Sequence, residues 1–417
     1  MSFHILDQNL MCDGVRLADI AAAHGTPTFV YSADHMVGRY RALATALAGL
    51  DTTICYAIKA NSNQAILTLL RQEGAGADVV SIGEYRRARR AGFATDKIVF
   101  AGVGKTRQEM AEALSGGLLQ FNVESVAELE ALNAVAGGLG TTAPIALRLN
   151  PDVDAKTHAK ITTGKAENKF GIPLAEADEL ATNLRNYPHI RLESLAVHIG
   201  SQLTDLQPYR AAYAILAQMA ANFISKGHDL KRLDIGGGLG VTYCDESEPD
   251  LAAFAQIVRE TVGPLGLPLV IEPGRYLVAR GGGLLTRTIY VKEGQKKRFV
   301  IADAAMNDLI RPTLYEAHHQ VRIAQGQMHT LPTDVVGPVC ETGDVLAGNR
   351  QLPIVDAGDL MLIEGAGAYA AVMGSTYNTR ALPAEVLVRG DRFDLIRARQ
   401  DLDTLIDLDV VPSDLSA

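Results

Sequence analysis

Lys59 is the residue whose surroundings point most directly to chemistry. It closes the apolar run Ile54-Cys55-Tyr56-Ala57-Ile58 and precedes Ala60-Asn61-Ser62-Asn63. The run predicts a short buried strand, and the small polar residues predict a turn into a helix. Burial at a strand end would disfavour the ammonium and leave a nucleophilic amine, which can form a Schiff base with a carbonyl cofactor such as pyridoxal phosphate. The alternative is a lysine that extends to solvent.

Two glycine turns offer sites for an anion. The segment Gly236-Gly237-Gly238-Leu239-Gly240 follows a predicted strand, so its backbone N–H groups could approach a phosphate closely. A tight turn without a ligand would need the same glycines. The segment Glu272-Pro273-Gly274-Arg275 sets a guanidinium beside an acid. Arg275 could bind a phosphate or carboxylate, or it could pair with Glu272.

His198 and Lys105 are two further candidates. His198, in His198-Ile199-Gly200-Ser201-Gln202, could stack on a planar cofactor ring, shuttle protons or be structural. The segment Gly102-Val103-Gly104-Lys105-Thr106 ends like a phosphate-binding loop, but Val99 occupies the position of the first glycine. We therefore expect Lys105 on the surface.

A repeated strand-then-helix pattern must position these residues. Continuous apolar strands separated by helical stretches predict a parallel sheet covered on both faces. Eight such units in about 220 residues favour a (β/α)8, TIM-like barrel over an open sheet. The chemistry of such barrels lies at the C-terminal strand ends, where Lys59, Asp78, His198 and both glycine turns fall. The strands are expected at 53–60, 77–81, 97–101, 118–123, 144–150, 192–199, 231–235 and 267–271.

The C-terminal third has a different pattern. Short β-rich runs bounded by Gly, Pro or Asp predict an antiparallel β domain, and the strand at 27–31 could belong with it. The expected fold class is α/β plus all-β: a barrel over residues 27–279, and a β domain from residues 1–26 and 280–417. The runs lie at 284–291, 298–301, 333–336, 360–363 and 385–389.

Composition narrows the class of protein. The chain of 417 residues has a formal net charge of −9 and no long basic run, so nucleic acid is not an expected partner. Its four cysteines are far apart, which predicts neither a disulfide framework nor a metal site. The N-terminus does not resemble a signal peptide, and no apolar run approaches a membrane span. A cytoplasmic protein without membrane association is expected.

Ordered motifs over nearly the whole length resemble the pyridoxal-phosphate-dependent decarboxylases of the alanine-racemase-like barrel fold (fold type III). Within that group the resemblance is to the diaminopimelate decarboxylase family. One departure is Thr342, where serine is commoner. The motifs are Tyr56-Ala57-Ile58-Lys59-Ala60-Asn61, Gly76-Ala77-Asp78-Val79-Val80-Ser81, Phe121-Asn122-Val123-Glu124-Ser125, Glu167-Asn168-Lys169-Phe170-Gly171, His198-Ile199-Gly200-Ser201-Gln202, Glu272-Pro273-Gly274-Arg275, Met306-Asn307-Asp308-Leu309-Ile310-Arg311-Pro312, Cys340-Glu341, Gly367-Ala368-Tyr369 and Tyr377-Asn378.

The resemblance implies a role for each barrel motif. Lys59 would carry pyridoxal phosphate as a Schiff base, and His198 would stack on the pyridine ring. Glu272 would face the pyridine nitrogen, where a carboxylate keeps the ring protonated and able to accept the electrons left by departing CO2. The implied cofactor contacts are completed by Asp78, Ser201, Gly237, Gly238, Gly274, Arg275 and Tyr369.

The resemblance also implies how a substrate would be held. Arg275, Arg311 and Tyr315 would bind the distal carboxylate of meso-diaminopimelate. Glu341 would receive its distal ammonium, and Tyr369 would contact both substrate and cofactor phosphate. A substrate with an amino acid group at each end needs partners of both charges, and this set supplies them.

Cys340 is implied to reprotonate the α-carbon, although a small buried structural residue is the alternative. In the family, Cys340 and Glu341 would reach the site from a partner subunit. The implied assembly is a homodimer with shared active sites. Cys12, Cys55 and Cys244 match no functional motif and are expected to be structural.

The function implied is conversion of meso-2,6-diaminopimelate to L-lysine and CO2, the last step of lysine biosynthesis. A decarboxylase of carboxynorspermidine, ornithine or arginine is a close alternative, against which Arg311, Tyr315 and the motif that begins at His198 weigh. A non-catalytic pyridoxal phosphate carrier or pseudoenzyme is an alternative of another class. The retained Lys59 and Cys340 and the second domain weigh against it.

Overall fold

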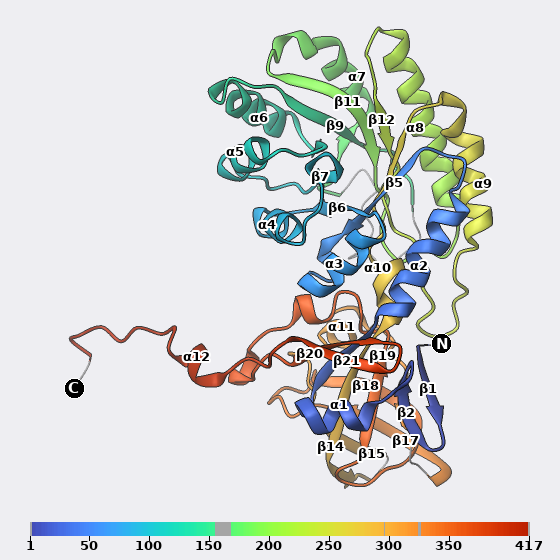
Figure 1. Ribbon diagram of the computed structural model, residues 1–417, viewed down its shortest axis with the longest axis vertical. Coiled ribbons are helices and arrows are strands. Elements are labelled where there is room, and N and C mark those ends of the chain that lie inside the picture. Colours follow the sequence, from blue (N-terminus) through green and yellow to red (C-terminus); the bar gives the residue numbers. More distant parts are fainter. Residues whose placement is uncertain (1, 155–167, 296, 324–326, 416–417) are drawn as a thin grey trace. The chain divides into compact units, whose positions relative to one another are not determined.

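The computed structural model describes residues 2–154, 168–295, 297–323 and 327–415. They form two compact units, which divide the chain after Met36 and after Leu277 (Figure 1). Val37–Leu277 form one unit, the barrel unit, and Met1–Met36 with Val278–Ala417 form the other, the β unit. Domain limits at residues 27 and 279 stay a prediction, and each unit is described by itself.

The barrel unit contains a closed ring of eight parallel strands, which confirms the predicted (β/α)8 barrel. Every strand expected from the apolar runs is present. Pairing of β8 with β9 closes the ring, and the short β10 (Ile172–Pro173) adds to β9. The ring strands are β5 (Thr52–Ala57), β6 (Gly76–Val79), β7 (Ile98–Phe100), β8 (Gln120–Val123), β9 (Ala143–Asn150), β11 (Ile190–Val197), β12 (Arg232–Asp234) and β13 (Leu269–Ile271).

Helices between the strands begin at residues that suit a helix N-terminus. Asn63, Ser81 and Ser125 each accept a backbone N–H of the first turn, and Thr106 forms a capping box with Glu109. These caps fix where the chain turns from strand end to helix. The helices are α2 (Ala33–Ala46), α3 (Gln64–Gln72), α4 (Ile82–Arg90), α5 (Arg107–Gly116), α6 (Val126–Gly138), α7 (Leu174–Asn183), α8 (Gln207–Ser225), α9 (Leu251–Thr261) and α10 (Arg275–Val278).

Side chains fill the interior of the barrel. Cys55, Val99 and Val270 form a buried cluster from β5, β7 and β13, with Leu119 packed against it. Layers made by alternate strands are the usual way in which such barrels are filled. The interior is therefore a core, and chemistry is confined to its ends.

The β unit contains a three-stranded sheet and a nine-stranded sheet. The small sheet is antiparallel and leads into α1 (Leu17–His24). Short helices α11 (Arg311–Tyr315) and α12 (Leu402–Ile406) complete the unit. The strands are β1 (Phe3–Leu6), β2 (Asn9–Cys12), β3 (Val15–Arg16), β4 (Thr28–Ser32), β14 (Gly282–Glu293), β15 (Arg298–Ala302), β16 (Val321–Ile323), β17 (Gln327–Val336), β18 (Val345–Ile354), β19 (Leu360–Glu364), β20 (Ala384–Arg389) and β21 (Arg392–Arg397).

The large sheet is mixed, whereas the sequence predicted only antiparallel pairing. Most neighbours are antiparallel, but β15 pairs with β17 and β4 pairs with β20 in parallel. Parallel neighbours need long connections, and both pairs have them: residues 303–326 separate β15 from β17, and β4 lies far from β20 in the chain. Strand periodicity carries no information on such long-range partners.

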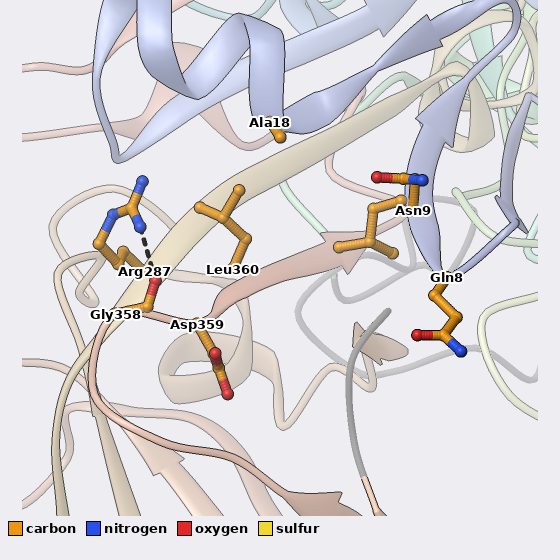
Figure 2. Close-up of a pocket in the computed structure, with 8 residues that line it drawn as sticks. Gln8, Asn9, Ala18, Arg287, Gly358, Asp359 and Leu360 are labelled. Carbon is orange, nitrogen blue, oxygen red and sulfur yellow. Dashed lines mark hydrogen bonds between the residues drawn. The ribbon is translucent and has the colours of Figure 1, made fainter.

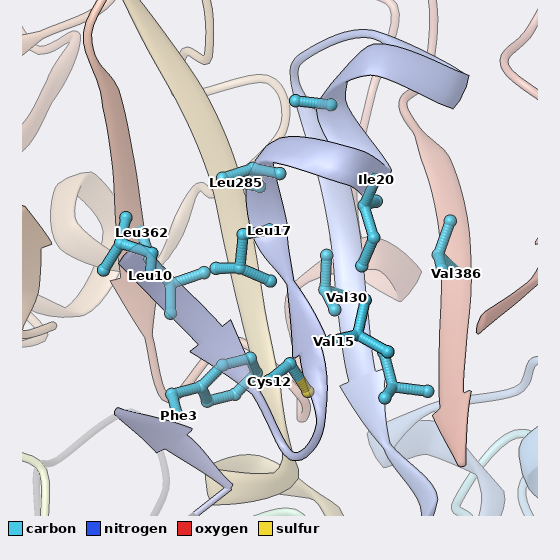
Figure 3. Packing of buried hydrophobic residues seen from close by; sticks show 12 residues of the cluster. Phe3, Leu10, Cys12, Val15, Leu17, Ile20, Val30, Leu285, Leu362 and Val386 are labelled. Atoms are coloured by element: carbon cyan, nitrogen blue, oxygen red, sulfur yellow. The ribbon is translucent and has the colours of Figure 1, made fainter. Parts of the chain in front are cut away.

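Strand β4 belongs to the sheet of the β unit, because it pairs with β14 as well as with β20. Its Val30 packs with Leu285, Leu362 and Val386 of that sheet in one buried cluster (Figure 3). Val388 of β20 also belongs to this cluster, and the other members come from the N-terminal sheet and α1: Phe3, Leu10, Cys12, Val15, Leu17, Ile20 and Ala21. The first 36 residues thus share a core with the C-terminal strands.

All four cysteines are free thiols. Cys12 and Cys55 are buried, and Cys244 and Cys340 are exposed. Across the ranges that the structure describes, no helix combines the length and apolar character needed to span a membrane.

Candidate active site at the barrel strand ends

Lys59 lies just beyond β5, in the 3-10 turn Ile58–Ala60, and not on the strand as predicted. The turn is fixed on both sides. Buried Tyr56 donates its hydroxyl to the Asn61 carbonyl at 2.9 Å, and Asn63 caps α3 by accepting the Ala65 N–H at 2.9 Å. The backbone therefore holds Lys59 at the C-terminal end of the barrel.

The Lys59 ammonium pairs with a buried carboxylate. Its Nζ lies 2.6 Å from Oδ2 of Asp78, which ends β6. The Lys59 side chain is 35% exposed and that of Asp78 is 0% exposed. The expected burial of Lys59 is thus wrong, because the strand ends at Ala57 and Lys59 lies in the turn beyond it, where its side chain is partly exposed. Its position is set by an ion pair instead.

His198 follows β11 and is fixed by the glycine turn after β12. Its Nδ1 accepts the backbone N–H of Gly237 at 3.1 Å. Burial, together with the charges of Arg148 and Lys59, holds the pKa of His198 well below its usual range. The imidazole is therefore neutral and carries its proton on Nε2.

The glycine turn is held closely against neighbouring strand ends. A Cβ added to Gly237 would lie 2.0 Å from the carbonyl oxygen of Glu272. Gly236 and Gly238 have φ of 68° and 106°, in the region that favours glycine. Glu272 donates its backbone N–H to the Gly236 carbonyl at 2.7 Å. Side chains are excluded here, so the turn and Glu272 form one packed unit.

The Glu272 side chain shares a buried polar cluster with Asp234 on β12. Asn122, on β8, donates through Nδ2 to Asp234 Oδ2 at 2.9 Å and to Glu272 Oε1 at 3.2 Å. Burial raises the pKa of Glu272 well above its ordinary value, and the negative charges of Asp234 and Asp78 raise it further. Both effects favour the protonated form of Glu272.

Arg275 begins α10, directly after the Glu272 turn. Its Nε and Nη2 donate to the Ser201 hydroxyl at 3.3 and 3.0 Å, and its Nη1 donates to the Tyr243 hydroxyl at 2.9 Å. The structure thus brings two predicted residues, Arg275 and Ser201, into contact. A buried guanidinium surrounded by hydroxyl groups suits a bound anion.

Lys105 is not on the surface, which corrects the prediction from the sequence. Its side chain is 1% exposed and its Nζ lies 2.6 Å from Glu128 Oε1. The same ammonium donates to the carbonyls of Gly102 and Asn122 at 2.7 and 2.8 Å. Three acceptors satisfy its three donors, so Lys105 is a structural residue that ties the ends of β7 and β8 together.

The remaining predicted residues lie in the β unit. Arg311 begins α11, is buried, and donates through Nε to Nε2 of fully buried His319 at 3.3 Å. The guanidinium carbon lies 5.8 Å from the ring centre of Tyr315, at the end of the same helix. The short helix therefore presents Arg311 and Tyr315 together, and their role in substrate binding stays a prediction.

Cys340 and Glu341 lie on the exposed turn between β17 and β18. Buried Asp344 anchors the turn by accepting the Val339 N–H at 2.7 Å, and Asn378 accepts the Cys340 N–H at 3.0 Å. A hydrogen bond from Tyr377 to Glu341 raises the pKa of that tyrosine. The alternative of a buried structural Cys340 is therefore wrong, because its thiol is exposed.

Tyr369 follows a close approach of two backbones in the β unit. A Cβ on Gly367 would lie 1.9 Å from the Val278 carbonyl oxygen. Tyr369 itself has φ of 54°, which a bulky residue rarely adopts. Such strain is retained where the surrounding fold requires a particular side-chain direction.

A cavity of about 200 Å³ in the β unit is separate from all these residues (Figure 2). Arg287 lies at its edge and donates to the Gly358 carbonyl at 2.5 Å. None of the predicted site residues contributes to its wall. The lining residues are Gln8, Asn9, Leu10, Ala18, Arg287, Gly358, Asp359 and Leu360.

Comparison with known proteins decides the family. Residues 33–279 match the pyridoxal-dependent decarboxylase family model for the pyridoxal binding domain. The chain is 46% identical over 409 residues to the diaminopimelate decarboxylase of Zymomonas mobilis, with 97% of each chain covered. It is 47% identical over 406 residues to that of Pseudomonas aeruginosa, again with 97% of each covered. The chain belongs to the diaminopimelate decarboxylase family. It is therefore a pyridoxal-phosphate-dependent carboxy-lyase.

Solved structures of the diaminopimelate decarboxylase family share the fold. The Helicobacter pylori enzyme complexed with L-lysine matches with a TM-score of 0.92 and 41% identity, covering 94% of this chain and 99% of that one. The M. jannaschii enzyme in co-complex with L-lysine matches with a TM-score of 0.94 and 34% identity, covering 99% of both. A lysine/ornithine decarboxylase from Vibrio vulnificus, at 22% identity and a TM-score of 0.79, shares the fold alone.

The barrel residues fit the cofactor of the diaminopimelate decarboxylase family. Oδ1 of Asp78 is buried and has no hydrogen-bond partner among the described residues, so a bound group with a donor beside Lys59 would satisfy it. Arg275 with Ser201 suits a phosphate, and neutral His198 offers a flat ring. The chemistry of this donor set matches a phosphorylated aromatic aldehyde.

Sequence reasoning missed Asp234 and assigned no role to Asn122. Asp234 has a signal that could have been used, since it is an acid between the apolar residues Leu233 and Ile235, two residues before the glycine turn begins at Gly236. A charged residue in a buried strand needs a partner, and here the partners are Asn122 and Glu272. Of the predicted motifs, Glu167 lies outside the described residues.

Proposed function

We propose that this chain converts meso-diaminopimelate to L-lysine and CO2. The observation that carries the proposal is the Lys59–Asp78 ion pair at the barrel strand ends, next to Glu272 and His198. It occurs in a chain that is 46–47% identical over nearly its full length to curated diaminopimelate decarboxylases.

Lys59 would hold pyridoxal phosphate through a Schiff base, and Glu272 would lie at the ring nitrogen. Bound there, the cofactor accepts the electron pair left when the α-carboxylate departs as CO2. Asp78 orients the Lys59 amine through the 2.6 Å contact. The remaining proposed cofactor contacts are Ser201, Gly237, Gly238, Gly274, Arg275 and Tyr369.

His198 would stack on the ring as a neutral imidazole. Its Nδ1 accepts the Gly237 N–H, so the ring plane is fixed by the glycine turn and its proton is held at Nε2. A neutral ring adds no positive charge beside the protonated pyridine, which would otherwise be disfavoured.

Charged residues of both signs would bind the distal end of the substrate. Arg311, with Arg275 and Tyr315, suits a carboxylate, and Glu341 suits an ammonium. Tyr369 would contact the substrate and the cofactor phosphate. This set distinguishes a substrate with two amino acid groups from ornithine or lysine, which lack the distal carboxylate.

Cys340 would return a proton to the α-carbon. Its exposed thiol on the turn between β17 and β18 is accessible to a second subunit. We propose a cytoplasmic homodimer in which Cys340 and Glu341 complete the site of the partner, since a two-fold pair is the commonest oligomer.

Substitution of Lys59 tests the proposal. Lys59→Ala should remove the visible absorbance of the cofactor-loaded protein and abolish lysine formation from meso-diaminopimelate. The control Lys231→Ala removes an exposed lysine, paired with Asp229 before β12, and should keep both. Full turnover in Lys59→Ala would refute the role of Lys59. Faster CO2 release from ornithine or carboxynorspermidine than from meso-diaminopimelate would assign the chain to a sister activity.

A further inference from the structure

Two carboxyl groups lie together inside the mouth of the barrel. Asp234 is 0% exposed and Glu272 is 8% exposed. They come from neighbouring strand ends, β12 and β13, and Asn122 reaches both from across the barrel, at 2.9 and 3.2 Å. Two buried carboxylates in such proximity cannot both be ionised without a large cost, so the pair retains one proton.

The hydrogen bonds of the two groups are unequal. Asp234 accepts the Gly236 N–H at 2.9 Å on Oδ1, and Asn122 and Gln120 at 2.9 and 3.3 Å on Oδ2. Within the described part of the chain, the Glu272 carboxyl accepts a hydrogen bond only from Asn122. Three N–H donors stabilise an anion strongly, so the charge lies on Asp234 and the proton on Glu272. Burial raises the pKa of both carboxyl groups. The hydrogen bond between them favours the same distribution of charge, because it raises the pKa of Glu272 further and opposes the rise in the pKa of Asp234.

The two amide side chains that donate to Asp234 are fixed by further hydrogen bonds. Gln120 donates to Asn122 Oδ1 at 2.8 Å and accepts from Arg232 Nη1 at 3.1 Å. Arg232 in turn pairs with Glu193 at 2.7 Å. The amide groups therefore have a fixed orientation, with their N–H groups toward Asp234. Neither amide can rotate without losing a hydrogen bond, which makes the unequal distribution of charge a property of the fold.

We propose that Asp234 is a positioning residue that acts through Glu272: it keeps a proton on the Glu272 carboxyl, and that proton is the one held at the cofactor's ring nitrogen. The proposal rests on the proposed function in one respect, the location of Glu272 at that nitrogen. The group that holds the proton at this site is then the pair of carboxyl groups of Asp234 and Glu272, and not Glu272 alone.

The proton is conserved in the transfer. With the cofactor bound, the Glu272 carboxyl would supply its proton to the ring nitrogen, an N–H bond replacing the O–H bond with no change in the total charge of the site. The negative charge of Asp234 would disfavour loss of this proton to solvent. A protonated ring would accept electrons more readily.

The other ionisable groups that face the pair do not replace Asp234. Asp78 and Lys59 form an ion pair with each other, so their effects on the pKa of Glu272 oppose each other. Burial raises the pKa of both Cys55 and Tyr213, which keeps these groups neutral. Asp234 is therefore the nearby group whose charge can be removed with the largest effect on Glu272.

Infrared spectra of the cofactor-free protein test the pair without any activity. At pH 7.5 the wild type should show a protonated-carboxyl band that Glu272→Gln removes and that Glu84→Gln leaves in place. Asp234→Asn should shift the titration of that band to lower pH by about one to three units, while Asp234→Glu should restore it. The control Asp334→Asn changes a buried, hydrogen-bonded aspartate of the β unit and should leave the band unchanged. Absence of the band in the wild type overturns the proposal even if Asp234→Asn does not fold.

Ring nitrogen protonation in the loaded enzyme gives the second readout. With ¹⁵N-labelled pyridoxal phosphate, the wild-type nitrogen signal should remain that of a protonated ring from pH 6 to pH 9, whereas Asp234→Asn should lose its proton within this range, about one to three units earlier than the wild type. Identical titrations in both proteins would overturn the role of Asp234. If the wild-type protein shows the carboxyl band but forms no lysine from meso-diaminopimelate, the proposed function is refuted. The proposal for Asp234 and Glu272 would still hold in that case.

Discussion

Two lysines follow barrel strands, and their acid partners give them different properties. Lys59 is partly exposed, contacts Asp78 and lies at the barrel mouth, where a ligand can reach it. Lys105 is enclosed, and its ammonium is fully satisfied by Glu128 and two carbonyls. A reactive amine must be accessible, so Lys59 is suited to chemistry and Lys105 to structure.

Lys105→Met should therefore destabilise the protein without a direct effect on chemistry. It leaves the Glu128 carboxylate buried without its cation, which costs about 3–5 kcal/mol of unfolding free energy. Urea unfolding measures this loss. The double variant Lys105→Met/Glu128→Gln should recover part of it, because the amide still accepts the Glu124 N–H and the buried charge is gone. An unchanged unfolding midpoint in Lys105→Met would contradict the burial seen here.

At the scale of elements, the turns after the strands place the functional groups. The glycine turn after β12 packs on Glu272 and donates to His198, so one backbone segment fixes both side chains. Caps at Asn63, Ser81 and Ser125 fix the starts of the helices that follow the other strands. The backbone conformation of the turns thus determines where these side chains lie.

Gly237→Ala should disturb this turn. The added Cβ would lie 2.0 Å from the Glu272 carbonyl oxygen, so the backbone must move. We expect a loss of roughly 1–3 kcal/mol of unfolding free energy from overpacking, together with weaker cofactor retention, as measured by thermal unfolding and visible absorbance. The matched control is Gly104→Ala, where nothing lies within 4 Å of the new Cβ. Equal behaviour of the two variants would show that the close packing is unimportant.

The start of α4 should contribute a pH dependence to stability. Burial raises the pKa of Glu84 to about 7, although its carboxyl accepts the Val80 N–H at 2.8 Å. An unfolded glutamate titrates near pH 4.3. Between about pH 4 and about pH 7 the folded protein keeps a proton that the unfolded chain has released. The free energy of unfolding contributed by Glu84 therefore falls as the pH rises.

Glu84→Gln should remove this contribution to the fall in unfolding free energy with pH, because the amide still accepts the Val80 N–H but cannot titrate. Urea unfolding of both proteins at several pH values between 4 and 8 measures the difference in slope. Parallel curves for the two proteins would show that Glu84 does not titrate in this range.

At the scale of the whole molecule, the predicted site draws on both units. The barrel unit holds Lys59, His198 and Glu272, and the β unit holds Arg311 and Cys340. A homodimer with shared sites would bring Cys340 of one subunit to Lys59 of another. This assembly remains a prediction, and it can be tested through the location of the two residues on different chains.

Mixing two inactive variants provides that test. If sites are shared, hybrids of Lys59→Ala and Cys340→Ala subunits contain one site with both residues intact. Dissociation and reassociation of an equal mixture should then restore about a quarter of the wild-type activity, since half of the dimers are hybrids with one intact site of two. Unmixed variants are the control. A mixture that stays as inactive as its components would place both residues on the same chain.

Local patterns in the sequence determined the barrel and most of its functional strand ends. Apolar runs of strand length predicted all eight ring strands, and the small polar residues after Lys59 predicted the start of the helix that follows. Lys59, His198, Glu272 and Arg275 could be singled out because each interrupts or ends such a run. A side chain that breaks a local pattern is visible without the fold.

Only the tertiary structure decided which of these groups meet. The pairing of β4 with C-terminal strands, the enclosure of Lys105 and the Asp234–Asn122–Glu272 cluster all join segments far apart in the chain. Strand and helix periods report which face of an element is buried, but not which distant element covers it. Burial and proximity then set the charges, and so it is the closed barrel that gives Asp234 its effect on Glu272.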